Sequence, residues 1–169
     1  ASCLVGSEMC IRDRKNIAFI EDAAQSLGAS LHGVKAGSIG DISTLSFNAN
    51  KVIAGIAGGG AVCTNDKEQA RLCKRLRKHG ENKILGYNSK MLLMNAEFIN
   101  FRLNRMKEWQ KMRQEIAKQY DEQLREYVTL QPTTTSLDHN YHKYVIRVQN
   151  KKVRDCLLYT SDAADDTPC

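Results

Sequence analysis

Three side chains in the first third of the chain have types and positions suited to chemistry on a carbonyl group. Asp22 ends a short apolar run, where a carboxylate has little structural reason to lie. Lys51 follows a second such run and precedes a glycine-rich loop, and Ser46 stands five residues before it. A lysine held among small residues is partly desolvated, so its amine deprotonates more easily and can form a Schiff base. Together the three favour a reactive site over the structural alternatives, a helix-capping aspartate and a solvent-exposed loop lysine.

These residues need strands that carry them to one edge of a sheet. Three short runs have the pattern of strands: 16–21, 42–47 and 61–64. The first is a short, largely apolar run, which is typical of a buried parallel strand. In open α/β sheets ligands bind beyond the carboxyl ends of the strands, so we expect Asp22 and Lys51 to face such a site.

Helical patterns follow the strands. Asn65 or Asp66 is expected to cap a helix that runs to about Lys78 and is ended by the next two residues, His79-Gly80. Between Leu92 and Leu124 apolar residues recur every three or four positions, which predicts one long amphipathic helix or two with a bend.

The order of these elements predicts an α/β fold, then a helical connector, then the beginning of a second, smaller domain. The boundaries that we expect are 15–90 for the partial α/β domain, 91–131 for the connecting helical region and 132–155 for the start of the C-terminal domain. Within the last part, the run 141–148 predicts a strand, and His142 is expected to pack at its start.

The two ends of the chain are predicted to derive from an adapter rather than from a gene. Residues 156–161 can be encoded TGT CTC TTA TAC ACA TCT, and the reverse complement, read one frame over, translates as residues 9–13. One DNA element in opposite orientations explains both ends, and it resembles the transposase adapter used in sequencing-library preparation. We therefore expect residues 1–14 and 156–169 to be adapter-derived, with disordered or arbitrary conformations.

Composition narrows the class of protein. The 169 residues are 42% hydrophobic and 26% charged, which permits a packed core and excludes a disordered or fibrous chain. Four of the six cysteines lie in the end segments, and the histidines lack metal-ligand spacing, so we expect neither a disulfide framework nor a metal site.

Charge and hydropathy exclude further classes. The longest weakly polar run, 52–63, is too short and too rich in glycine to span a bilayer, so we expect no membrane contact. The net charge of +6 permits anionic partners. The most basic helical stretch, 71–78, has leucines at packing positions and no interleaved aromatic residues, so we expect no binding to nucleic acid.

Five motifs in order and spacing resemble the DegT–StrS family of sugar aminotransferases: IEDAAQSLGA, SFNANK, GGGAVCTND, RKHG and GYNSKM. The similarity covers residue 17 to about residue 148. It implies part of the large α/β domain of a fold type I transferase dependent on pyridoxal 5′-phosphate, a long connecting helix and the start of a small α+β C-terminal domain. It also implies transfer of an amino group, usually from glutamate, to a nucleotide-linked keto-sugar in cytoplasmic amino-sugar and cell-surface polysaccharide biosynthesis.

The resemblance assigns roles to five residues. In this family the lysine matching Lys51 forms a Schiff base with the cofactor, and the aspartate matching Asp22 pairs with the pyridinium nitrogen. The glutamine matching Gln25 lies against the cofactor ring, and the serine matching Ser46 binds the cofactor phosphate. The asparagine of the GYN motif, here Asn88, reaches the phosphate of the neighbouring subunit's cofactor, so the resemblance implies a homodimer with shared sites. A protonated ring nitrogen and a nearby lysine amine are what proton transfer at the substrate carbon needs.

The sequence also departs from the family pattern. After the lysine the family commonly has Gly-Glu-Gly-Gly, whereas residues 55–60 read GIAGGG, with no acid and one residue more. Members with an Asn-Gly-Asn-Lys type signature lack that acid too, so we interpret the change as a subfamily difference. A dinucleotide site is disfavoured, because a strand rather than a helix follows these glycines.

Two alternatives to the aminotransferase remain open. Some relatives replace the lysine by histidine and dehydrate sugars, so retention of Lys51 favours transamination over a pyridoxal-phosphate-dependent dehydratase. A non-catalytic or regulatory relative of the same fold is the other alternative. The upstream part of the cofactor pocket and most of the C-terminal domain have no counterpart here, so we expect a fragment of a longer enzyme that is inactive alone.

Overall fold

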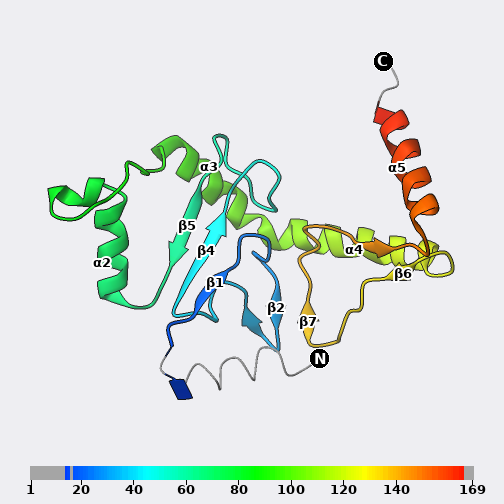
Figure 1. Ribbon diagram of the computed structural model, residues 1–169, viewed down its shortest axis with the longest axis horizontal. Coiled ribbons are helices and arrows are strands. Elements are labelled where there is room, and N and C mark those ends of the chain that lie inside the picture. Colours follow the sequence, from blue (N-terminus) through cyan, green and yellow to red (C-terminus); the bar gives the residue numbers. More distant parts are fainter. Residues whose placement is uncertain (1–13, 16, 166–169) are drawn as a thin grey trace.

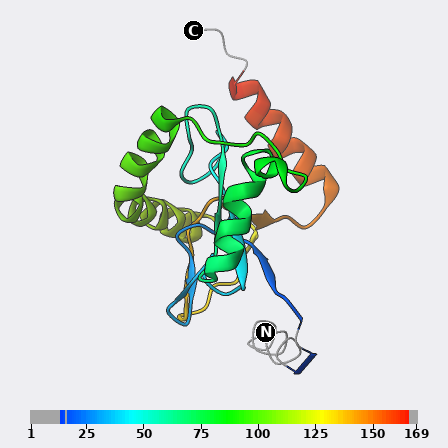
Figure 2. The same cartoon turned by 90° about the vertical axis from the view of Figure 1, so that its left-hand side faces the viewer.

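The computed structural model describes residues 14–15 and 17–165. A small sheet lies in the middle, with helix α2 beside strand β5 (Figure 1). Helices α3 and α4 follow each other and extend to one side of the sheet (Figure 1), and helix α5 follows β8 near the C-terminal end of the chain (Figure 2). No helix in the described part of the chain is long and apolar enough to cross a membrane.

The central sheet has three strands in the order β1-β4-β5: β1 (Ile20–Asp22), β4 (Ile42–Ser46) and β5 (Gly60–Cys63). β1 and β4 are parallel, whereas β4 and β5 are antiparallel with Ser46 opposite Gly60. The three predicted strands are therefore confirmed. The prediction that the first is buried is wrong, because β1 is an edge strand of this sheet and Ile20 is 69% exposed.

A second sheet links two distant parts of the chain and was not predicted. Its strands are β2 (Ser30–Leu31), β3 (Val34–Lys35) and β7 (Leu137–Asp138), in the antiparallel order β3-β2-β7. Each is only two residues long, and a strand this short does not produce an alternating pattern in the sequence. β7 brings the C-terminal stretch back onto the region that follows β1 (Figure 1). The division into domains stays a prediction.

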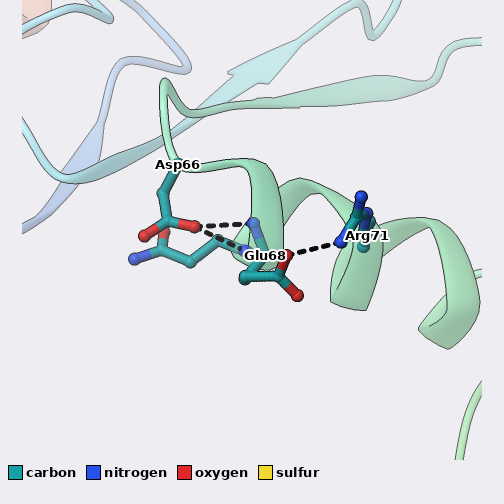
Figure 3. A network of polar contacts seen from close by, with 4 residues as sticks. Asp66, Glu68 and Arg71 are labelled. Atoms are coloured by element: carbon teal, nitrogen blue, oxygen red, sulfur yellow. Dashed lines mark hydrogen bonds and ion pairs between the residues drawn. The ribbon is translucent and has the colours of Figure 1, made fainter.

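Helix α2 (Lys67–Leu76) begins at a side-chain cap. One carboxylate oxygen of Asp66 accepts from the N–H groups of Glu68 at 2.7 Å and Gln69 at 2.9 Å (Figure 3). Glu68 in turn pairs with Arg71 at 2.6 Å. The cap is therefore Asp66 rather than its neighbour, and it satisfies two of the amide groups that a helix start leaves without partners.

The segment with the long apolar pattern forms two helices, α3 (Leu93–Asn104) and α4 (Met106–Leu124). Of the two predicted alternatives, one helix or two with a bend, the structure has two. They meet at Arg105, whose ψ of 0° departs from helical geometry. A short helix η1 (His79–Asn82) precedes α3. The helices cover a core cluster of Phe47, Ile53 and Ile99, against which these partly buried side chains pack: Leu27, Leu45, Val52, Ala61, Met91, Leu103, Met106 and Trp109.

The C-terminal stretch forms less strand than predicted. β6 (Thr129–Leu130) pairs with β8 (Ile146–Arg147), so the expected strand over 141–148 is reduced to two residues. The residues before β8 contact α4 instead, since the Tyr144 hydroxyl donates to Asp121 at 2.6 Å.

Helix α5 (Lys151–Asp165) continues past the predicted boundary at residue 156, where we expected no defined conformation. Its described side chains, at 151–159, are all exposed. The predicted adapter-derived residues 1–13 and 166–169 lie outside the described residues.

Candidate functional site

The candidate site is built on the edge of the sheet where β1 and β4 end. The strands are parallel, with Asp22 opposite Thr44, and the Ala23 N–H donates to the Thr44 carbonyl at 3.0 Å. Ser46 ends β4 two residues further on, about 7 Å along the strand. The segment that carries Lys51 follows directly. Asp22 and Ser46 therefore end neighbouring parallel strands at one edge of the sheet, and the loop that carries Lys51 begins at that edge.

Asp22 is exposed at the end of β1. One oxygen of its carboxylate accepts from the Ala24 N–H at 3.0 Å and closes the turn that follows. Residues 24–28 are a turn, so the alternative role of a helix cap does not apply. Asp22 has no ion pair with another described residue, which leaves its second oxygen for a ligand.

Lys51 is half-buried in the loop between β4 and β5. Its backbone N–H donates to the Asn48 carbonyl at 3.0 Å, and Ile53, two residues later, is completely buried. Its amine makes neither a hydrogen bond nor an ion pair within the described part of the chain. The backbone of Lys51 is therefore held in place, whereas its amine is available to a ligand. The half-buried Ser46 hydroxyl accepts from the Asn48 N–H at 3.4 Å.

Two other predicted residues lie differently. The Gln25 side chain is exposed in the turn after Asp22, and its backbone carbonyl accepts from the side-chain amide of Asn140 at 2.9 Å. Asn88 belongs to another part of the molecule, where it forms an antiparallel bridge with Lys78 after the end of α2. A position away from Lys51 suits a residue that is predicted to serve the neighbouring subunit.

His142 was expected to pack at the start of a strand over 141–148, but it lies four residues before β8. Burial, and then the positive charges of Lys51, Lys143 and Arg113, lower the pKa of His142 below its ordinary value. Both ring nitrogens are buried without a hydrogen-bond partner among the described residues. No spacing in the sequence signals the burial of this ring.

Arg113 of α4 joins the same region. Its Nε donates to the Asn140 carbonyl at 3.0 Å, and its Nη2 is buried with no partner in the described structure. Burial lowers the pKa of Arg113. The periodic pattern of the helix marks this residue only as polar, so its place beside Asn140 could not be predicted from the sequence.

The residues present fit pyridoxal phosphate on the chemistry of their donors. An amine that can form a Schiff base, a carboxylate that can pair with a pyridinium and a hydroxyl that can donate to a phosphate share one edge of the sheet. Neither the amine of Lys51 nor the carboxylate of Asp22 is engaged in an ion pair with the residues that the structure describes. Both charged groups are therefore available to such a cofactor.

The chain is similar to known proteins in both sequence and structure. The sequence profile of the DegT/DnrJ/EryC1/StrS aminotransferase family matches residues 3–164. A protein of Geobacillus stearothermophilus named pleiotropic regulatory protein is 33% identical over 150 residues, which are 83% of this chain and 40% of that protein. The dTDP-3-amino-3,6-dideoxy-alpha-D-galactopyranose transaminase of Aneurinibacillus thermoaerophilus is 32% identical over 157 residues, 89% of this chain and 43% of that protein.

Among solved structures, S. venezuelae DesV in complex with a ketimine intermediate has a TM-score of 0.85 at 26% identity. The match covers 94% of this chain and 45% of that one.

The fold is thus that of part of a fold type I pyridoxal-phosphate-dependent aminotransferase, as predicted. The chain belongs to the DegT/DnrJ/EryC1/StrS aminotransferase family. It spans less than half the length of the relatives described above. The matched range extends past the predicted boundaries at residues 14 and 156, and the adapter origin of the two ends stays a prediction.

Proposed function

We propose that this chain is the central part of a pyridoxal-phosphate-dependent aminotransferase. The amino donor is an amino acid, glutamate by family precedent, and the acceptor is a nucleotide-linked keto-sugar in cytoplasmic amino-sugar and cell-surface polysaccharide biosynthesis. Relatives named as dTDP-sugar and UDP-sugar aminotransferases support the substrate class. The single observation that carries the proposal is the shared sheet edge of Asp22, Ser46 and Lys51, with the lysine amine free of any ion pair to a described residue.

The residues divide the chemistry between them. When bound, pyridoxal phosphate supplies an electron sink for the carbanion at the amino-bearing carbon. Asp22 would pair with the ring nitrogen and hold its proton, because an anion favours the charged form of that nitrogen. Lys51 would hold the cofactor through Nζ, and its amine would take up and return the substrate proton. Ser46 would donate its hydroxyl to the phosphate, and Gln25 would lie against the ring.

The same proposal includes a homodimer in which Asn88 reaches the phosphate in the partner's site. The segment after η1 supports it, since it exposes large apolar side chains: Leu85 (85% exposed), Tyr87 (70%), Leu92 (70%), Leu93 (78%), Met94 (78%) and Phe101 (60%). Such a run of exposed apolar residues is typical of an interface.

Absorbance of the complete gene product tests the proposal. The purified protein should show the visible band of a lysine-bound cofactor, and Lys51→Ala should abolish that band. Lys35→Ala, at an exposed lysine of β3, is the matched control and should keep it. A band that persists in Lys51→Ala would show that the assignment of this lysine is wrong.

A second experiment separates the alternative functions. The complete protein is given cofactor, glutamate and a nucleotide-linked keto-sugar. Formation of the amino sugar supports the aminotransferase. Binding without turnover supports a regulatory relative, and loss of water from the sugar supports a dehydratase.

A further inference from the structure

A buried side chain of helix α3, Asn95, makes hydrogen bonds to the loop that carries Lys51. Asn95 lies near the start of α3 and is 5% exposed. Its Nδ2 donates to the Gly58 carbonyl at 2.7 Å, and its Oδ1 accepts from the Ala57 N–H at 3.4 Å. Both partners belong to the glycine-rich end of the lysine loop.

Two glycines of this loop lie so close to neighbouring side chains that a Cβ atom would not fit there. A Cβ on Gly55 would lie 2.5 Å from the Asn95 Oδ1, and a Cβ on Gly59 would lie 2.7 Å from the Met91 Cε. Gly59 also has a φ of +122°, which side-chain-bearing residues rarely adopt. The absence of a side chain at Gly55 therefore allows the loop to approach the Asn95 side chain of α3 closely.

The backbone connects this contact to the lysine. The Gly55 N–H donates to the Phe47 carbonyl at 2.8 Å, and the Phe47 N–H donates to the Gly59 carbonyl at 2.8 Å. These two bonds close the loop on either side of the residues that Asn95 holds. Lys51 lies inside the closed loop, so a displacement of residues 55–59 from α3 would shift the position of its amine.

We propose that Asn95 is a positioning residue for Lys51: its side-chain amide fixes the glycine-rich end of the loop against α3 and so sets where the lysine amine lies. This inference rests on the proposed function, since it concerns the same lysine. Among the described residues, the hydrogen bonds of the Asn95 side chain go to the backbone of Ala57 and Gly58 and not to Lys51, so it acts through the backbone of residues 55–59. The amide is suited to this task because it donates and accepts at once, to one carbonyl and one N–H of the same loop.

Asn95→Asp is the sharpest variant, because it keeps the shape of the side chain and the acceptor but replaces the donor. At pH 8 a carboxylate oxygen would face the Gly58 carbonyl, and we expect pyridoxal phosphate to bind about tenfold more weakly than to the wild type, the loss that one hydrogen bond accounts for. A protonated carboxyl can donate again. The ratio of variant to wild-type affinity should therefore recover as the pH falls toward 5, which a general loss of stability would not produce.

Hydrogen exchange gives a readout that needs no cofactor. In protein freed of cofactor, Asn95→Ala should speed amide exchange at residues 55–60 and leave exchange in α2 unchanged. Asn100→Ala, at an exposed asparagine of the same helix, is the matched control and should change neither exchange nor cofactor affinity. Asp66→Ala, which removes the cap of α2, controls for stability, since it should lower the melting temperature without loosening the loop.

The outcomes are distinct. Faster loop exchange in Asn95→Ala together with weaker cofactor binding in both Asn95 variants supports the inference. Unchanged loop exchange overturns it, and so does faster exchange with unchanged cofactor affinity. If wild-type protein fails to bind the cofactor at Lys51, the proposed function falls, and the exchange data still decide whether Asn95 holds the loop.

Discussion

The side-chain amide of Asn140 donates to the backbone carbonyl of Gln25 at 2.9 Å, across 115 positions of the sequence. The same amide donates to the Leu27 carbonyl at 3.0 Å, and the Asn140 carbonyl accepts from Arg113. Asn140 is 4% exposed. It therefore joins the C-terminal stretch and α4 to the turn directly behind Asp22, and the site depends on residues from three separate parts of the chain.

Replacing Asn140 by Ala should lower the free energy of unfolding by more than replacing an exposed polar residue does. The Gln25 and Leu27 carbonyls would lose their partner in a buried place, which costs about 1–3 kcal/mol. Urea unfolding measures this loss. Asn104→Ala, at an exposed asparagine of α3, is the matched control and should change the free energy of unfolding by less than about 0.5 kcal/mol. Equal stabilities for the two variants would contradict the importance of the contact.

The strands and the residues that follow them could be predicted from the sequence because both depend on local pattern. Alternation over 42–47 and an acidic residue after an apolar run placed Ser46 and Asp22 within one residue of the observed strand ends. The helical period placed α3 and α4, although it could not decide between one helix and two.

What the sequence could not show are contacts between distant residues. The β2–β7 pairing consists of two residue pairs, and the contact of the Asn140 amide with the Gln25 carbonyl depends on how the C-terminal stretch folds back. Neither leaves a periodic signal. The exposure of β1 was also missed, since an apolar run does not reveal whether its strand lies inside a sheet or at an edge.

Replacing Asp22 by Asn should reduce turnover much more than cofactor binding. The amide keeps the shape of the side chain but lacks the charge that favours a protonated ring nitrogen. We expect kcat to fall by about two orders of magnitude, the usual size of a proton-transfer contribution, with the visible band of the lysine-bound cofactor retained. Steady-state kinetics and an absorbance spectrum of the same sample measure both. Unchanged kcat would remove Asp22 from the proposed chemistry.

Stability should fall in mild acid because of His142. Burial, with Lys51, Lys143 and Arg113 nearby, lowers its pKa in the folded state below 6.5. Between the two pKa values the unfolded chain binds more protons than the folded one, so stability is fully present above pH 6.5 and is lost as the pH falls through the folded-state pKa. His139, whose pKa is lowered by burial, contributes in the same direction.

Urea unfolding at several pH values between 7.5 and 5 measures that loss. His142→Gln should make the decline of the free energy of unfolding shallower, because glutamine does not titrate. His139→Gln should remove a separate part of the decline, and the double variant should be the flattest. A decline that is as steep in His142→Gln as in the wild type would show that protonation of this imidazole does not oppose folding.

The Tyr144 hydroxyl donates to the Asp121 carboxylate at 2.6 Å and fastens the segment before β8 to α4. Burial, then this hydrogen bond and the charges of Asp121 and Tyr141, raise the pKa of Tyr144 to about 12. Because the folded state keeps the phenol proton that the unfolded state loses near pH 10, this part of the stability is present below pH 10 and disappears as the pH rises toward 12.

A double-mutant cycle with Tyr144→Phe and Asp121→Asn tests the pair at neutral pH. A hydrogen bond to a carboxylate on a half-exposed surface should give a coupling of about 1 kcal/mol. Tyr127→Phe, at a tyrosine that is 74% exposed, should give no coupling with Asp121→Asn. In alkaline unfolding experiments, Tyr144→Phe should also lose less stability than the wild type between pH 10 and pH 12. Zero coupling, or an unchanged alkaline slope, would mean that this contact does not hold the C-terminal stretch on the helix.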